Sequence, residues 1–348
     1  MPIVIEGGRV PNQLSRKNRS RPVRSTGSQE IQGKLLRIAL INNMPDSALE
    51  DTEVQFFELL ESAAGEIPVS LKLYSLPELP RNDAGRQHLS NFYFEIADLL
   101  NSRFDGVIMT GTEPRQPDLR NEPYWPVLTE VLDWAEQSTA STVLSCLAAH
   151  AGVLYSDEVP RHRLADKQFG VFEYISARDH ALMEGVGEMM QIPHSRWNEV
   201  REDELASCGY EILTRSAGAG VDLFVKRKKS SLFVHFQGHP EYGTRTLLKE
   251  YRRDIKRFLR RERETYPTMP LGYFDAAAAK LVSDFQEIVI ADPGEKLLAK
   301  FPEAALVDAV QGTWHASAAM VYRNWLKYLQ LRKADPSALS AMTPVARA

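Results

Sequence analysis

The stretch STVLSCLAAHAG, residues 141–152, decides how the fold is interpreted. Its first half contains a short apolar run, Thr142-Val143-Leu144, with the length and β-branched character of a buried strand. Small and apolar residues recur at helical spacing directly after Cys146. A buried strand that turns straight into a helix is the repeating unit of a parallel sheet covered by helices, and it leaves Cys146 at the turn.

Strand-like and helix-like segments alternate along the first half of the chain. Apolar runs over residues 35–42, 69–76, 104–111 and 142–145 predict buried strands. Segments over 52–60, 91–100 and 124–136 carry apolar residues at helical spacing. Alternation with short connections predicts an α/β fold with a mostly parallel central sheet flanked by helices.

The second half of the chain has a different pattern. Short strands over 170–176, 209–216, 221–228 and 231–236 predict a mixed or antiparallel extension of the sheet. A long helix over 244–264 has one apolar face and one basic face, and a last helix over 314–331 packs on the body. The basic face is either a solvated surface or a ligand patch.

The two ends of the chain differ from its body. Residues 11–30 are polar and basic without an apolar period, which is typical of a surface arm. An organelle transit peptide is the alternative, but its amphipathic pattern is missing. We expect a mobile basic arm over 1–33, a single domain over 34–331 and a disordered tail over 332–348.

Bulk composition restricts the class of protein. The chain has 348 residues, 43% of them hydrophobic, enough for a sizeable core. Its formal charge of -4 gives no general attraction to nucleic acid. No apolar run of about 18 residues predicts a membrane helix, and the N-terminus lacks the pattern of a secretory signal. Two cysteines cannot form the disulfide framework of a secreted protein, so we expect a cytoplasmic location.

Cys146 is the first candidate for chemistry. The carboxyl end of a parallel strand exposes its side chains, and a helix N-terminus stabilises a thiolate. The N–H of Leu147, the next residue, is the best candidate to hold an oxyanion. A cysteine among small apolar residues is also compatible with an inert core position, so the turn alone does not decide.

VHFQGHPEYG, residues 234–243, supplies what a cysteine nucleophile needs. An apolar strand stops at Gly238, and His239 follows with Glu241 two residues later. A cysteine requires a base, and the base requires an orienting carboxylate. His239 beside an unrelated surface glutamate is the alternative. Together with the Cys146 turn, the pattern favours a Cys146–His239–Glu241 triad.

Other polar positions are less decisive. His194 is as compatible with a structural role as with a functional one, while Ser195 and Arg196 are suited to hydrogen-bond an amino acid. His150 lies one helical turn after Cys146 but has no accompanying carboxylate. The chain has neither a zinc-spaced Cys/His cluster nor a glycine-rich phosphate loop, so we expect no metal and no cofactor.

Taken together, the motifs resemble the homoserine O-succinyltransferase/O-acetyltransferase family, whose members are triad acyltransferases with a class I glutamine-amidotransferase-like (flavodoxin-like) fold. The resemblance covers about residues 35–331. It rests on INNMP (41–45), TEVQFFELL (52–60), FDGVIMTG (104–111), YWPVLTEVLDWA (124–135), the STVLSC turn, KQFGVFEY (167–174), PHSR (193–196), GHPEY (238–242), EYRRD (250–254) and NWLKYL (324–329).

The resemblance implies a homoserine O-succinyltransferase acting in methionine biosynthesis. Cys146 would accept the acyl group from acyl-CoA and pass it to L-homoserine, with His239 as base and Glu241 as its orienter. Lys167, Ser195 and Arg253 match family positions that bind substrate. A homodimer is also implied, while acyl-CoA is a substrate and not a cofactor.

Two departures from the family pattern affect the site. Leu147 stands where the family has tryptophan after the cysteine. Asp46 and Ser47 replace a lysine pair of which one member helps form the oxyanion site, so oxyanion binding depends more on backbone N–H groups. At the position that distinguishes succinyl from acetyl donors, the alignment places Arg115, which could pair with a succinyl carboxylate.

Several functions remain open at this level. Acetyl-CoA as the donor and serine as the acceptor are near variants of succinyl transfer. A glutamine-amidotransferase-like amidohydrolase would use the same triad with water as the acceptor. A non-enzymatic protein that binds a CoA ester or an amino acid is the third class. Neither a nucleic acid nor a membrane is an expected partner.

Overall fold

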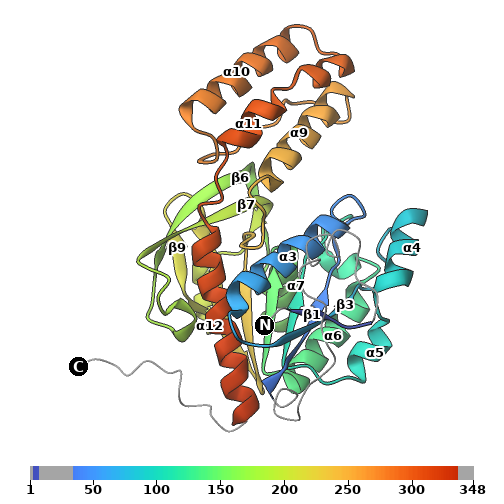
Figure 1. The fold of residues 1–348 in the computed structure, drawn as a ribbon, viewed down its shortest axis with the longest axis vertical. Coiled ribbons are helices and arrows are strands. Elements are labelled where there is room, and N and C mark those ends of the chain that lie inside the picture. Colours follow the sequence, from blue (N-terminus) through green and yellow to red (C-terminus); the bar gives the residue numbers. More distant parts are fainter. Residues whose placement is uncertain (1–2, 8–33, 336–348) are drawn as a thin grey trace.

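The computed structural model describes residues 3–7 and 34–335 (Figure 1). Its centre is an eight-stranded sheet with the order β1-β3-β2-β4-β5-β12-β11-β8. The first six strands in this order are parallel, and β11 and β8 are antiparallel additions. The strands are Val4–Ile5 (β1), Leu36–Ile41 (β2), Val69–Tyr74 (β3), Gly106–Met109 (β4), Ser141–Ser145 (β5), Glu211–Ile212 (β8), Leu223–Lys228 (β11) and Ser231–Phe236 (β12).

Helices cover both faces of this sheet. In β2 the side chains alternate, with Ile38 and Leu40 in one apolar cluster and Ala39 and Ile41 in the other. The first cluster includes side chains of α3 (Leu49–Ala64) and α12 (His315–Ala334), and the second includes side chains of α5 (Ile96–Leu100), α6 (Trp125–Ser138) and α7 (Leu147–Asp157). The predicted α/β class with a mostly parallel, helix-flanked sheet is confirmed.

A second, four-stranded antiparallel sheet has the order β10-β9-β6-β7. It consists of His162–Ser176 (β6), Met189–Glu199 (β7), Thr214–Ser216 (β9) and Gly220–Val221 (β10), and α8 (Glu202–Ser207) follows β7. The prediction that the strands of the second half extend the central sheet is therefore wrong for the strand over 170–176 and for Thr214–Ser216, the end of the strand predicted over 209–216. β6 pairs with β7, which the sequence pattern did not place, and with β9.

A helical lobe stands at the far end of the molecule (Figure 1). It contains α9 (Thr246–Leu259), α10 (Ala276–Ala291) and α11 (Glu303–Ala309) around its own apolar core, which includes Tyr251 and Trp314. The helix predicted over 244–264 is thus shorter than expected. The helix predicted over 91–100 is also shorter, because α4 (Asp83–Phe92) ends first and α5 begins only at Ile96.

The predicted domain ends shift at two places. Residues 3–7 belong to the sheet through β1, where Ile3 is buried, so an arm over 1–33 would begin only after residue 7. The rest of that arm, residues 8–33, lies outside the described residues. At the other end α12 continues to Ala334, and residues 336–348 of the predicted tail lie outside the described part.

In the described ranges 3–7 and 34–335, the helices are all too short or too polar to cross a membrane.

Candidate active site

Cys146 occupies a strained turn between a strand and a helix. β5 ends at Ser145 and α7 begins at Leu147, and Cys146 between them has φ 54° and ψ −115°. A positive φ is unfavourable for a residue with a side chain and persists only where the surroundings impose it. Here the Cys146 N–H donates to Phe236 O of β12 at 2.7 Å, which fixes the turn. The residue as a whole is partly exposed.

His239 and Glu241 follow the end of the neighbouring strand β12. Because β5 and β12 are parallel neighbours, their carboxyl ends meet at one edge of the sheet. His239 Nδ1 lies 2.8 Å from Glu241 Oε1, and the two residues are only 6% and 7% exposed. The three predicted triad residues are therefore brought together.

The protonation of His239 depends on both partners. Burial lowers the pKa of His239, but the charges of Cys146 and Glu241 and their hydrogen bonds to the imidazole raise it more. The result is a pKa well above the ordinary value. His239 is therefore an imidazolium at neutral pH when Cys146 is a thiolate, which is the starting state of a thiolate nucleophile.

The predicted oxyanion donor, the Leu147 N–H, lies at the first turn of α7. Leu147 is the first residue of α7, so its N–H has no acceptor within the helix. Gly111, which follows β4, packs so closely that a Cβ on it would lie 2.8 Å from Leu147 N. Sequence reasoning missed Gly111, although the MTG turn at the end of a predicted strand was a usable signal.

Asp46, which replaces a lysine of the family pattern, has a structural role here. Its carboxylate accepts the Asn82 N–H at 2.7 Å and contacts Arg81 Nη1 at 3.2 Å, which fixes the start of α4. Asn43 joins the same loop to β4, with its N–H donating to Thr110 Oγ1 at 2.8 Å. This loop therefore presents backbone and amide groups, and not a lysine ammonium.

Lys167, Ser195 and Arg253 converge on one carboxylate. Lys167 Nζ lies 3.6 Å from Glu250 Oε2, Arg253 Nη2 lies 3.5 Å from the same atom, and the Ser195 hydroxyl donates to it. Asp254 is a second anchor, at 3.3 Å from Lys167 Nζ. The three predicted residues come from β6, β7 and α9 and lie in one cluster.

Glu250 at the centre of this cluster was not predicted. Burial raises its pKa, but Lys167, Arg253, Ser195 and Tyr242 lower it more, so the carboxylate is ionised. Tyr242 donates from its hydroxyl to Glu250 Oε1 at 2.6 Å. The alternation of charge in EYRRD was the available signal, since Glu250 and Asp254 lie one helical turn apart.

His194 and Arg196 lie behind the triad and not in an open pocket. Both are buried, and Arg196 Nε donates to His194 Nδ1 at 3.1 Å. Arg196 also donates to Ala219 O at 2.8 Å, so its guanidinium is already occupied by protein. His194 Nε2 contacts the Tyr174 hydroxyl at 2.8 Å. These contacts favour the structural alternative for His194.

Two further predicted positions lie outside the triad. His150 is buried and hydrogen-bonds Gln237 at 3.0 Å, and burial lowers its pKa to about 3, which is unsuited to a base near neutral pH.

Arg115 is exposed on the loop after β4, and its backbone N–H donates to Glu122. Its predicted role in acyl choice stays a prediction. Within residues 3–7 and 34–335, no group of three or more His, Cys, Asp or Glu side chains has the geometry of a metal site.

A partly exposed cysteine on a strained turn, beside a strand end that carries a buried and hydrogen-bonded His–Glu pair, is the arrangement of a cysteine-nucleophile enzyme on an α/β sheet. Comparison with known proteins gives the particular family. The family model "HTS: Homoserine O-succinyltransferase" matches residues 2–335. The chain belongs to the homoserine O-succinyltransferase family.

Relatives from two bacteria support this assignment. The homoserine O-succinyltransferase of Rhodopseudomonas palustris is 43% identical over 293 residues, 84% of this chain and 88% of that protein. The homoserine O-succinyltransferase of Bradyrhizobium japonicum is 45% identical over 296 residues, covering 84% and 90%.

Among solved structures, two glutamine amidotransferases are similar. The one from Methylobacillus flagellatus has a TM-score of 0.46 at 15% identity and covers 85% of this chain and 95% of that chain. The one from Thermotoga maritima has a TM-score of 0.43 at 13% identity and covers 85% and 98%.

Proposed function

We propose that this chain transfers a succinyl group from succinyl-CoA to the side-chain hydroxyl of L-homoserine, a step of methionine biosynthesis. The observation that carries the proposal is the position of Cys146 on its strained turn at the end of β5, beside the end of β12, which the buried and hydrogen-bonded His239–Glu241 pair follows. The activity named for the relatives supports the choice of donor and acceptor.

The first half-reaction acylates the cysteine. The Cys146 thiolate attacks the thioester carbonyl of succinyl-CoA and forms a carbon–sulfur bond, while the Leu147 N–H stabilises the oxyanion. The bond from the carbonyl carbon to the CoA sulfur then breaks. The departing thiolate takes the proton of the His239 imidazolium, which leaves His239 neutral and the succinyl group on Cys146.

The second half-reaction transfers the acyl group. Neutral His239 accepts the proton of the homoserine hydroxyl as the oxygen attacks the Cys146 thioester. The carbon–oxygen bond forms, the carbon–sulfur bond breaks, and Cys146 leaves as a thiolate beside a recharged imidazolium. Glu241 holds Nδ1 of the ring throughout, so that Nε2 keeps its direction toward the reacting atoms.

The cluster around Glu250 has the charges that an amino acid requires. Lys167 and Arg253 are cations suited to the α-carboxylate, and Glu250 is a partly buried anion suited to the α-ammonium group. Ser195 donates and accepts hydrogen bonds. Tyr242 connects this cluster to the triad, because it hydrogen-bonds Glu250 and stacks on His239.

The proposal is tested by steady-state assays that follow CoA release. Succinyl-CoA or acetyl-CoA is combined with homoserine or serine, and we expect the highest kcat/KM for succinyl-CoA with homoserine. Varying both substrates should give parallel double-reciprocal lines, as a ping-pong reaction requires. Glu250→Gln should raise KM for homoserine at least about tenfold, because a charge-assisted contact is lost. The matched variant Glu264→Gln, at an exposed position, should not.

Other outcomes would redirect the proposal. CoA release at the same rate with and without an acceptor would indicate a hydrolase. A clear preference for acetyl-CoA or serine would keep the mechanism but change the substrate.

A further inference from the structure

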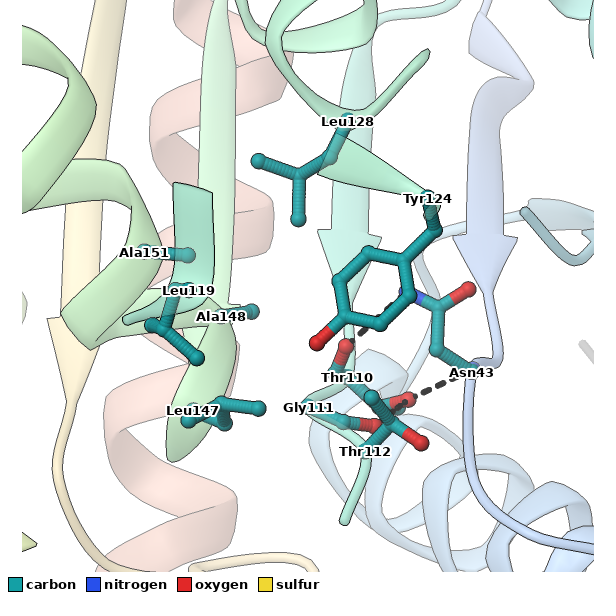
Figure 2. Close-up of a pocket in the computed structure, with 10 residues that line it drawn as sticks. All are labelled: Asn43, Thr110, Gly111, Thr112, Leu119, Tyr124, Leu128, Leu147, Ala148 and Ala151. Carbon is teal, nitrogen blue, oxygen red and sulfur yellow. Dashed lines mark hydrogen bonds between the residues drawn. The ribbon is translucent and has the colours of Figure 1, made fainter. Parts of the chain in front are cut away.

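A small recess lies beside the turn that carries Cys146 (Figure 2). Its walls include Gly111, Thr112, Leu119, Tyr124, Leu147 and Ala148. Its closed part measures about 10 Å³, room for roughly one water molecule. Because Gly111 and Leu147 flank the oxyanion position, the recess is adjacent to the acyl carbon of any thioester on Cys146.

The Tyr124 hydroxyl is a free donor at this recess. Tyr124 is 4% exposed, and its hydroxyl is buried without a hydrogen-bond partner in the described part of the chain. Figure 2 shows the hydroxyl directed toward the side of Leu147 and Ala148. A buried hydroxyl that has no partner is unfavourable, so a ligand that accepts its hydrogen bond would be stabilised.

A second unpartnered donor belongs to Arg161, which lies between α7 and β6. Its Nη2 donates to Pro117 O at 2.9 Å, whereas Nη1 is buried without a partner among the described residues. Burial lowers the pKa of Arg161, while Tyr124, Glu122 and Asp118 act in the opposite direction. Through its hydrogen bond to Pro117 O, Arg161 holds the loop that continues to Leu119 and Tyr124, both of which line the recess.

Glu122 is the nearby anion, and one of its two carboxylate oxygens is engaged by backbone N–H groups. Its Oε1 accepts the Gln116 N–H at 2.7 Å and the Arg115 N–H. Its Oε2 is buried and has no partner in the described residues. No ion pair joins Glu122 to Arg161 in residues 3–7 and 34–335, so the Arg161 charge is not neutralised by direct contact.

On the basis of the proposed function, we propose that this recess receives the acyl chain and that its terminal carboxylate is bound by Tyr124, which lines the recess, and by Arg161, which holds the adjoining loop at Pro117. The donor selected would be a dicarboxylic acyl-CoA of the succinyl class. A phenol O–H and a guanidinium N–H are both suited to a carboxylate. An acetyl group has no charged end and would leave both donors unpartnered. Because the closed part is so small, Leu119 or Leu147 rotates as the chain enters.

Arg115 is the alternative candidate for binding the carboxylate of the acyl chain. Its side chain is exposed and forms no hydrogen bond or ion pair in the part of the chain that the structure describes. It lies on the same loop, two residues before Pro117, whose carbonyl Arg161 holds. The two candidates differ in burial, and substitution separates them.

The test measures kcat/KM for succinyl-CoA and acetyl-CoA with saturating acceptor, together with the rate of Cys146 acylation. Arg161→Met should lower the succinyl value about 10- to 100-fold and change the acetyl value less than about threefold. Tyr124→Phe should lower the succinyl value about 3- to 10-fold. Arg161→Lys keeps the charge and should recover part of the loss. Arg120→Met, in an exposed pair with Asp118 nearby, is the matched control and should change neither donor.

The outcomes are distinguishable. If Arg161→Met lowers kcat/KM to the same extent for succinyl-CoA and acetyl-CoA, with the unfolding temperature unchanged, the inference is overturned and Arg161 has a structural role. A preference that changes in Arg115→Glu but not in the Arg161 and Tyr124 variants would place acyl choice on Arg115. If Arg161→Met does not fold, the ratio of kcat/KM for succinyl-CoA to that for acetyl-CoA in Tyr124→Phe and Arg161→Lys tests the inference, and an unchanged ratio in both would overturn it. Failure of the wild-type protein to form an acyl-enzyme from either donor would contradict the proposed function instead.

Discussion

The ring of Tyr242 stacks on the imidazole of His239, with centroids 4.2 Å apart and planes at 15°. The Tyr242 hydroxyl donates to Glu250, which Lys167 and Arg253 surround. One side chain therefore contacts both the proposed base and the proposed acceptor site. Substitution can remove either the hydrogen bond alone or both contacts.

The first prediction concerns the two contacts of Tyr242. Tyr242→Phe keeps the stacking and removes one hydrogen bond, so KM for homoserine should rise about 3- to 10-fold. Tyr242→Leu removes both, so it should also change the pH profile of Cys146 alkylation by iodoacetamide, which requires no substrate. Identical alkylation profiles for wild type and Tyr242→Leu would contradict a positioning role for the ring.

The second prediction concerns Glu241. Glu241→Gln keeps the shape of the site but removes the charge that favours the His239 imidazolium, so kcat should fall on the order of 10²-fold. Because the folded pKa of His239 is raised, its contribution to stability is fully present below its unfolded pKa of about 6.5 and is lost as pH rises through the folded value. The stability lost in Glu241→Gln should therefore be larger at pH 6 than at pH 10.

That difference is measured by denaturant unfolding at the two pH values. An equal loss of stability at both would mean that the charge of Glu241 does not act on His239. Glu264→Gln, at an exposed position, is the control for removing a glutamate charge.

The third prediction concerns Gly111. Gly111→Ala places a Cβ 2.7 Å from Leu147 Cβ and 2.8 Å from Leu147 N, so the backbone proposed to hold the oxyanion must move. We expect kcat to fall on the order of 10²-fold, with a smaller effect on the unfolding temperature. Gly218→Ala, where a Cβ meets nothing within 4 Å, is the matched control. Full activity in Gly111→Ala would exclude this oxyanion position.

The fourth prediction concerns Asp222, a fully buried carboxyl whose Oδ1 accepts the Gly238 N–H directly before His239. Burial raises the pKa of Asp222 to about 7, although the Gly238 N–H and Arg196 lower it. A raised folded pKa makes the wild type lose stability as pH rises from about 4 to about 7. Asp222→Asn keeps an acceptor and does not titrate. The free energy of unfolding of the wild type minus that of the variant should therefore decline over this pH range.

Asp222→Ala leaves the Gly238 N–H without its acceptor and should be less stable than Asp222→Asn by about 1–3 kcal/mol in the free energy of unfolding at every pH. Unfolding curves from pH 4 to 8 check both variants. A wild-type-minus-Asp222→Asn difference that does not depend on pH would show that Asp222 keeps an ordinary pKa in the folded protein.

The central sheet and the triad were predictable from the sequence because both depend on local patterns. An apolar run followed by a helical period fixes β5 and α7, and a parallel sheet brings the ends of β5 and β12 to one edge. Cys146 and His239 therefore meet although 92 residues, 147–238, lie between them in the sequence. The motif supplies the residue types, and the topology supplies their proximity.

The second sheet and Glu250 were not predictable in the same way. β6 pairs with β7, and this pairing includes a register irregularity between Arg163 and Gln168 that no local pattern reveals. Glu250 is a charged residue on an apparently basic helix face, which sequence patterning treats as solvated. Its role follows only from Lys167 and Ser195, which reach it from two strands.

The acylation of Cys146 is the central claim, and intact-protein mass spectrometry tests it most directly. The protein is incubated with succinyl-CoA, and separately with acetyl-CoA, without an acceptor. We predict a mass gain of one succinyl group that maps to Cys146, is absent in Cys146→Ala and disappears when L-homoserine is added. No adduct from either donor, with Cys146 still open to alkylation, would contradict the account.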